Sequence, residues 1–223
     1  MSHMDMASQT RFADTKPSRG NTYQRNGKRC FDVALGLALL PIIVPVLLWI
    51  LFLSRIIGGV TLFGHTRVGR YGQQFTCWKV QTMFENSNSI LAQHLANNPC
   101  AAEEWRRTQK LTSDPRVTPL GRFLRRTSLD ELPQIWNVLR GDMSFVGPRP
   151  VTQAEMHRYG NSIHAYQSVR PGITGQWQIY GRMDGCYQKR VQMDEKYCRT
   201  ISIFSDLNLI VLTGMLLFKI TGK

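Results

Sequence analysis

The sequence predicts a mixed α/β protein that is mostly helical and that inserts one N-terminal helix into a membrane. Three observations support this class: an uncharged apolar run at residues 33–53, β-forming residues interrupted by glycines at residues 60–83, and helix-forming stretches separated by prolines after them. These segments divide the chain into a polar tail over residues 1–27, a membrane segment over residues 28–56 and a folded domain over residues 57–223.

The composition narrows the range of partners. The 223 residues include 28 Lys and Arg against 15 Asp and Glu, which gives a formal net charge of +13. A charge of this size favours an anionic partner such as nucleic acid, acidic lipid head groups or phosphorylated metabolites. The five cysteines have no Cys-x-x-Cys spacing and no even count, so a reducing cytosolic environment fits better than a disulfide framework or a metal cage. The tail is polar with little apolar periodicity, which is typical of disorder.

The apolar run at residues 33–53 carries no charge and is long enough to cross a bilayer, which takes about 20 residues. A cleaved signal peptide fits poorly because no small-residue cleavage site follows, and a core helix fits poorly because the run has no polar face. Pro41 and Pro45 each remove a backbone donor, so the helix should bend or break there. Basic residues flank both ends, which favours a cytoplasmic location for both. We therefore expect a re-entrant helix, with a break at the prolines, that returns to the cytoplasmic face.

A second apolar segment lies near the C-terminus, at residues 207–218. It is too short to cross a bilayer. A core helix and an amphipathic helix lying at the membrane interface explain it about equally well.

The region between the two apolar segments predicts short strands and helices. Residues 60–83 contain β-formers interrupted by Gly64, Gly69 and Gly72, and they predict a strand, a tight glycine turn and a second strand. Residues 86–110 predict two helical pieces separated at Pro99. A short basic helix follows Pro119 and carries Arg122, Arg125 and Arg126.

Two adjacent carboxylates, Asp130 and Glu131, follow this basic helix in the stretch "RRTSLDELPQIW". Ser128 and Glu131 have the spacing of a capping box, which would give Glu131 a structural role only. Alternatively, Pro133 is the first residue of a helix and both carboxylates precede it. In either case they lie at a helix N-terminus, where the helix dipole favours the ionised and nucleophilic form. Capping is the commoner role for acidic residues at such positions.

Two loops rich in proline and glycine each carry arginine among small residues. The first, "GDMSFVGPRP", holds Arg149, and the second, "RPGITGQWQIYGR", holds Arg170 and Arg182. Such loops let a phosphate approach the backbone amides while an arginine binds it through two hydrogen bonds. We expect these loops and the basic helix to bind phosphate, although an ordinary surface loop with a solvated charge is the alternative.

The order of these motifs resembles a known family. The stretches "RVGRYGQQF", "KVQTM", "DPRVTPLGRFLRRTSLDELPQIWNVLRGDMSFVGPRP" and "RPGITGQWQIYGR", together with the proline-containing apolar run, resemble the bacterial sugar transferases. These are the monotopic phosphoglycosyl transferases that begin exopolysaccharide and O-antigen assembly. The resemblance covers roughly residues 28–218 and is long and specific over residues 114–150. A departure lies at Val44 before Pro45, where many members have serine.

The resemblance implies a cytoplasmic catalytic domain on the bacterial inner membrane. It implies transfer of hexose-1-phosphate, from galactose or glucose, from a UDP-hexose to undecaprenyl phosphate in contact with membrane lipid, with release of UMP. By the motif match, Asp130 is the nucleophile that forms a covalent aspartyl intermediate and Glu131 binds the cofactor Mg²⁺. The expected substrate-binding residues are Lys79, Arg126, Arg149, Arg170 and Arg182.

The residues fit this chemistry. An aspartate can attack phosphorus, cations neutralise a diphosphate, and Mg²⁺ often binds through one or two carboxylates plus substrate phosphates. A nucleic-acid binder would explain the charge but not the apolar run, so we expect no nucleic-acid partner. A membrane-anchored, non-catalytic scaffold would explain the run but would leave the carboxylate pair without a role. The sequence fixes neither the hexose nor the oligomeric state, and a homodimer remains open.

Overall fold

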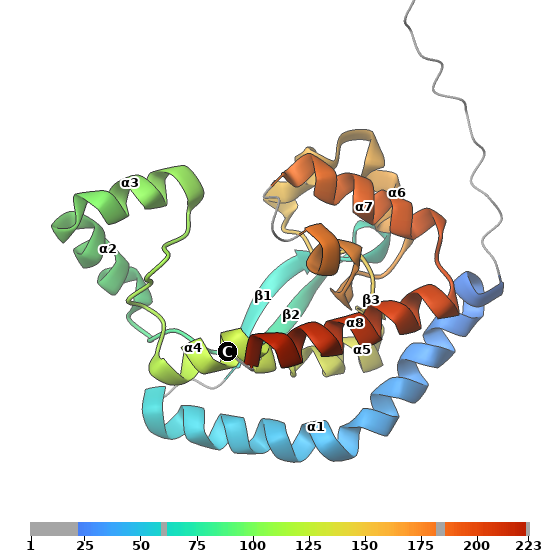
Figure 1. Ribbon diagram of the computed structural model, residues 1–223, viewed down its shortest axis with the longest axis horizontal. Helices are drawn as coiled ribbons and strands as arrows, with labels where there is room; N and C mark the ends of the chain where they lie inside the picture. The colour runs from blue at the N-terminus through green and yellow to red at the C-terminus, as the bar shows by residue number, and fades with distance from the viewer. Residues whose placement is uncertain (1–21, 59–61, 182–185, 222–223) are drawn as a thin grey trace, which may run out of the picture.

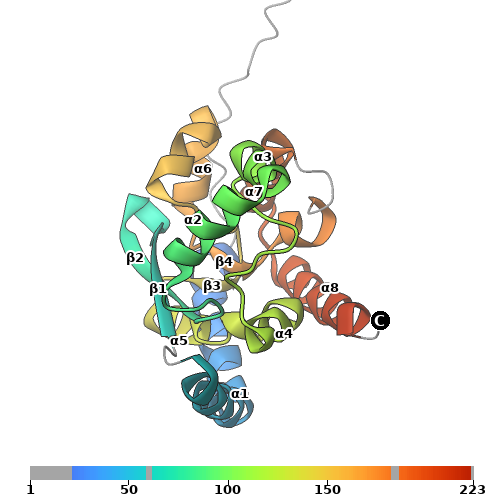
Figure 2. The same ribbon diagram turned by 90° about the vertical axis from the view of Figure 1, so that its left-hand side faces the viewer.

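The computed structural model describes residues 22–58, 62–181 and 186–221. Within these ranges the chain is mostly helical and forms two small two-stranded sheets (Figure 1). The predicted mixed, mostly helical class is therefore confirmed. Two views at right angles place the second half of the long helix α1 (Lys28–Gly58) along one edge of the molecule, with the other elements on one side of it (Figure 1, Figure 2).

Helix α1 contains both prolines of the apolar run, Pro41 and Pro45. The helix bends along its length but is continuous from Lys28 to Gly58 (Figure 1). The break expected at the prolines is thus a bend, because each proline removes one backbone hydrogen bond while the neighbouring turns keep theirs.

In the described part of the chain, α1 is the one helix with the length and composition to cross a membrane. Little of it is buried: Leu48, Trp49 and Phe52 are each more than half exposed. An exposed apolar surface of this extent indicates contact with a membrane or a partner. Whether the helix spans the bilayer or re-enters it stays a prediction.

The folded part of the chain begins before α1. Tyr23–Gly27 forms a short π-helical segment, η1, that leads directly into α1. The Tyr23 hydroxyl donates a hydrogen bond to Asp206 Oδ2 at 2.8 Å, and its ring packs against a buried apolar cluster. The predicted tail over residues 1–27 is therefore wrong for its last residues, because a tertiary contact far away in the sequence orders them, while residues 1–21 lie outside the described part.

The first sheet is the predicted hairpin. Strands β1 (Leu62–Val68) and β2 (Gln74–Val80) pair in antiparallel fashion, from Leu62 opposite Val80 to Val68 opposite Gln74. The turn between them, η2 (Arg70–Gly72), places Gly72 at a φ of 76°, a conformation that glycine adopts without strain. The predicted strand, glycine turn and second strand are confirmed.

The predicted helices after the hairpin are also confirmed. Helix α2 (Ser87–Asn97) ends just before Pro99, the first residue of α3 (Pro99–Thr108), and Asn98 caps α3 by accepting a hydrogen bond from the Ala101 amide. Figure 1 shows α2 and α3 as a pair that projects from the rest of the molecule. The basic helix is α4 (Pro119–Thr127), which also begins with a proline.

The second half of the chain alternates short helices with the two strands of the second sheet. Its elements are α5 (Gln134–Arg140), β3 (Ser144–Val146), η4 (Gln153–Ser162), α6 (Ile163–Ser168), β4 (Gly172–Thr174), η5 (Trp177–Gly181), α7 (Tyr187–Arg199) and α8 (Ile203–Thr221). Strands β3 and β4 pair in parallel.

Helix α8, which contains the C-terminal apolar segment, has one buried face and one exposed apolar face. Asp206 and Leu209 are buried, and Leu209 packs in the same cluster as Val146 and Tyr197. On its other side Phe204 is 81% exposed and Val211 is 60% exposed. One face of the helix therefore belongs to the core, while the other presents apolar side chains outward.

Candidate active site

Asp130 and Glu131 lie in a short 3₁₀ turn, η3 (Leu129–Glu131), between α4 and α5. Ser128 ends α4 in a left-handed conformation with a φ of 57°, and its side chain makes no capping hydrogen bond. The capping-box interpretation is therefore wrong. The Glu131 carboxylate instead accepts a hydrogen bond from Lys79 Nζ at 2.6 Å, a salt bridge that joins the turn to β2.

Helix α5 begins just beyond this turn. Its first residue is Gln134 and Pro133 is its N-cap, one residue later than expected. Burial is the largest influence on Asp130 and raises the pKa of its carboxyl group, whereas Lys79 lowers this pKa and Glu131 raises it. The expectation that the helix terminus would favour the ionised form is overridden, because removal from water favours the neutral acid.

The hairpin supplies one wall of the site. Side chains two residues apart on a strand point to the same face, so Lys79 shares a face of β2 with Cys77 and Phe75. Arg67 on β1 lies directly opposite Phe75, which places its side chain on that same face. Arg67 was not among the predicted site residues, although strand alternation and the register of the hairpin place it on the same face as Lys79.

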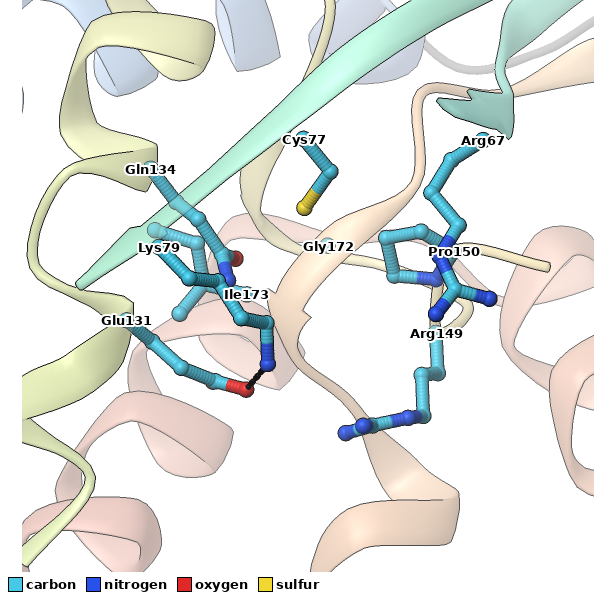
Figure 3. Close-up of a pocket in the computed structure, with 9 residues that line it drawn as sticks. All are labelled: Arg67, Cys77, Lys79, Glu131, Gln134, Arg149, Pro150, Gly172 and Ile173. Atoms are coloured by element: carbon cyan, nitrogen blue, oxygen red, sulfur yellow. Dashed lines mark hydrogen bonds and ion pairs between the residues drawn. The ribbon is translucent and has the colours of Figure 1, made fainter. Parts of the chain in front are cut away.

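A pocket opens against this face. Its walls come from the hairpin, the carboxylate turn, the start of α5, the loop that follows β3 and the start of β4. The lining residues are Arg67, Cys77, Lys79, Glu131, Gln134, Arg149, Pro150, Gly172 and Ile173. Figure 3 shows Lys79, Glu131 and Gln134 on one side of the pocket and Arg67 and Arg149 on the other. Three cationic side chains thus share the pocket lining with one carboxylate, an arrangement suited to a polyanionic ligand.

The positive charges of Arg67 and Arg149 act against each other. Burial lowers the pKa of the Arg67 guanidinium, and the like charge of Arg149 adds to this effect. Glu155 offsets part of it from 3.4 Å away. An anion bound between the two guanidinium groups would relieve their repulsion and could accept hydrogen bonds from both.

The predicted substrate-binding arginines divide between pocket and periphery. Arg149 lines the pocket. Arg170 does not: its Nε donates a hydrogen bond to the Gly141 carbonyl oxygen at 2.7 Å, at the end of α5. Arg126 is exposed in the last turn of α4 and is not part of the pocket lining. Arg182 lies outside the described residues.

The neighbour of Arg126 is closer to the carboxylates. Arg125 Nε donates a hydrogen bond to Thr82 Oγ1 at 2.8 Å, and the Arg125 charge lowers the pKa of Asp130. The sequence could not distinguish two adjacent arginines, because the choice depends on how α4 packs against the chain after β2.

The glycine-rich loops serve mainly to pack against each other. The Gly147 amide donates to the Thr174 carbonyl at 2.9 Å, and the Gly172 amide donates to the Pro148 carbonyl at 2.8 Å. A Cβ atom on Gly172 would lie 2.1 Å from the Gly147 nitrogen, so only glycine permits this approach. These two amides are therefore occupied by the chain itself, while Arg149 of the first loop lines the pocket.

The carboxylates suit a Mg²⁺ ion that arrives with phosphate ligands. Glu131 presents its carboxylate to the pocket, and Asp130 precedes it in the same turn. Among the described residues, no group of three or more His, Cys, Asp or Glu side chains could enclose a metal ion. The donor set therefore fits Mg²⁺ held by one or two carboxylates and substrate oxygens rather than an all-protein cage.

All residues that line the pocket or form the carboxylate turn lie within the part of the chain that one family model matches. The model of the family described as bacterial sugar transferase matches residues 23–220. The chain belongs to the bacterial sugar transferase family. The predicted family resemblance is thus confirmed over nearly all of the chain that the structure describes.

Three relatives illustrate the similarity of the chain to members of this family, over the share of each chain that is aligned. It is 43% identical over 195 residues to a UDP-galactose-lipid carrier transferase of Erwinia amylovora, an alignment covering 87% of this chain and 41% of the relative. It is 46% identical over 187 residues to the exopolysaccharide production protein ExoY of Rhizobium meliloti, covering 83% of each chain. It is 38% identical over 195 residues to the UDP-glucose:undecaprenyl-phosphate glucose-1-phosphate transferase of Escherichia coli, covering 83% of this chain and 39% of the relative. The chain spans about two fifths of the first and third relatives.

Proposed function

We propose that this sugar transferase moves hexose-1-phosphate from a UDP-hexose to undecaprenyl phosphate and releases UMP. The observation that carries the proposal is the pocket that Lys79, Arg67 and Arg149 line together with Glu131, with Asp130 in the same turn as Glu131. The names of the Erwinia amylovora and Escherichia coli relatives support a UDP-sugar as donor. The name of the Escherichia coli relative also supports undecaprenyl phosphate as acceptor. The product is the first lipid-linked sugar of an exopolysaccharide.

The reaction proceeds by two displacements at one phosphorus atom. A carboxylate oxygen of Asp130 attacks the β-phosphorus of the UDP-hexose, and the bond from this phosphorus to the bridging oxygen breaks, so UMP leaves with that electron pair. The product is an aspartyl phosphate that carries the hexose. A phosphate oxygen of the lipid then attacks the same phosphorus and releases Asp130 as a carboxylate. Burial of Asp130 raises its pKa, which makes the ionised carboxylate a stronger base and a better nucleophile.

The cations and the second carboxylate have separate roles. Arg67, Arg149 and Lys79 neutralise the phosphate charge, and Lys79 also holds Glu131 in place through their 2.6 Å salt bridge. Glu131 would hold Mg²⁺ together with substrate oxygens, and this ion would supply further charge neutralisation for the departing UMP.

The membrane positions the acceptor. We propose that α1 enters the bacterial inner membrane from the cytoplasm, bends at Pro41 and Pro45 and returns to the same side, while the exposed apolar face of α8 lies at the interface. Single-cysteine variants that carry only Cys30, or only Gly58→Cys, should both resist an impermeant maleimide added from the periplasm. Labelling at one end alone would indicate a spanning helix.

Release of UMP by the purified protein tests the activity. We expect release from one or more of UDP-galactose and UDP-glucose, dependence on Mg²⁺, and a lipid-linked hexose diphosphate when undecaprenyl phosphate is added. The preferred donor identifies the hexose. A protein that binds vesicles but releases no UMP from any UDP-sugar would instead be a membrane scaffold.

A further inference from the structure

Arg67 and Arg149 come from distant segments that one buried hydroxyl joins. The Tyr166 hydroxyl donates a hydrogen bond to the Val68 carbonyl at 2.6 Å and accepts one from the Val151 amide at 3.2 Å. The Val68 amide donates to the Val151 carbonyl at 2.9 Å. Tyr166 is only 2% exposed, so its hydroxyl has no access to bulk water. This bridge lies one residue beyond Arg67 and two beyond Arg149, and it therefore fixes the separation of their backbones.

A second set of contacts reaches the same two arginines. Arg190 Nη2 donates to the Arg149 carbonyl at 2.9 Å, and Arg190 Nη1 lies 3.9 Å from Glu155 Oε1. The other carboxylate oxygen of Glu155 lies 3.4 Å from Arg67 Nη1 and accepts hydrogen bonds from the Thr152 amide and hydroxyl at 2.8 and 2.9 Å. Glu155 is thus held by its own helix cap and in turn holds Arg67. The backbones and one of the two guanidinium groups are fixed before a ligand arrives.

The arrangement fits one class of ligand. Both arginines line the pocket and the charge of Arg149 lowers the pKa of Arg67, so an anion with several oxygens between them would offset their repulsion and could accept hydrogen bonds from both. They lie across the pocket from Lys79 and Glu131 (Figure 3), so a ligand with two phosphates could contact cations on both sides. The diphosphate of a UDP-hexose is such a ligand.

We propose that Arg67 and Arg149 form a clamp for the donor diphosphate and that Tyr166 is the positioning residue that sets their spacing. The proposal rests on the proposed function for the identity of the donor, but its diphosphate chemistry is testable without turnover. Because preformed contacts reduce the ordering cost of binding, loss of the Tyr166 bridge weakens donor binding more than it slows the chemical step.

Tyr166→Phe removes the bridge, and Tyr197→Phe is its matched control. The Tyr197 hydroxyl also makes two buried hydrogen bonds, to the Val146 carbonyl and to Asp206, but at the base of α1. We expect Tyr166→Phe to raise KM for the UDP-hexose about tenfold, which corresponds to about 1.4 kcal/mol, with little change in kcat or in KM for undecaprenyl phosphate. Tyr197→Phe should leave both KM values unchanged. An equal rise in KM in both variants, or a rise confined to the lipid phosphate, would overturn the assignment.

Inorganic pyrophosphate provides a readout that does not need catalysis. It should raise the unfolding temperature of the wild type, more than inorganic phosphate does, and should do so less in Tyr166→Phe and Arg67→Gln. Arg67→Lys keeps the charge and should recover part of the shift. Unchanged stabilisation by pyrophosphate in Tyr166→Phe would refute the clamp. A wild type that shows these responses but releases no UMP from any UDP-sugar would retain the clamp and lose the proposed function.

Discussion

At the start of α1 a buried lysine and a buried aspartate pair with each other, whereas the pocket lining carries three cations and one carboxylate. Asp206 is fully buried, and its carboxylate accepts hydrogen bonds from Lys28 at 2.7 Å, Tyr23 at 2.8 Å and Tyr197 at 2.8 Å. Burial of such a group is tolerated because nearby donors satisfy both of its oxygens. This cluster, Lys28 with Asp206 and the two tyrosines, is the anchor cluster.

The pocket uses similar residue types without that balance. Arg67, Lys79 and Arg149 share its lining with one carboxylate, Glu131, and the charge of Arg149 lowers the pKa of Arg67. The difference teaches how to separate structural from functional charge in this fold. The paired charges of the first region hold parts of the chain together, and the excess of cations in the pocket makes it a candidate site for an anionic ligand.

The two regions are connected through α5. Arg29, next to Lys28 in α1, donates from Nη2 to the Leu139 carbonyl at 2.7 Å, near the end of α5. The start of α5 follows the turn that holds Asp130 and Glu131. Arg29 therefore joins the start of α1 to the helix that follows Asp130 and Glu131.

Breaking the anchor cluster should produce the largest loss of stability. Asp206→Ala leaves Lys28 buried without its partner, and we expect the free energy of unfolding to fall by about 3–5 kcal/mol. Denaturant unfolding in detergent micelles measures this change. Glu103→Ala, which removes an exposed carboxylate paired with Arg106 and Arg107, is the control and should have little effect. Similar losses in the two variants would remove the distinction between the regions.

Removing a pocket cation should lower activity without lowering stability. Arg149→Gln should lower kcat/KM for the UDP-hexose by roughly 10²–10³-fold, the usual loss when a preorganised charge-stabilising donor is removed. Its unfolding midpoint should stay unchanged or rise, because the repulsion with Arg67 disappears. Arg122→Gln, an exposed change on α4, is the control for both measurements. A variant that loses stability as well as activity would mean that Arg149 has a structural role.

The smallest expected effect is a shift in pH dependence. The nucleophile must be ionised, and burial raises the pKa of Asp130, so the acidic limb of kcat/KM should lie above the ordinary range for an aspartate. Arg125 lowers this pKa, so Arg125→Gln should move the limb to still higher pH. Arg122→Gln should not move it. A wild-type limb at the ordinary aspartate value, unmoved by Arg125→Gln, would contradict a buried nucleophile.

The sequence predicted elements better than contacts. The glycine turn of the hairpin, the proline starts of α3 and α4 and the long apolar helix each follow from local chemistry, and each is present. The salt bridge of Glu131 does not follow from local chemistry, because its partner Lys79 lies on a strand distant in the sequence. The same reason explains why Arg67 was missed and why the amides of the glycine-rich loops are occupied. Tertiary contacts decide which of several similar charges faces the pocket.

The proposed mechanism requires the donor to bind first, since Asp130 otherwise has no phosphorus to attack. Mass spectrometry of peptides after incubation with UDP-hexose and Mg²⁺, without lipid, tests this claim most directly. We predict a hexose-phosphate adduct on Asp130 that disappears when undecaprenyl phosphate is added, and no adduct in a folded Asp130→Asn variant. Rapid quenching at several time points that finds no adduct on the active wild type, or finds one on another residue, would contradict the role of Asp130 as the nucleophile.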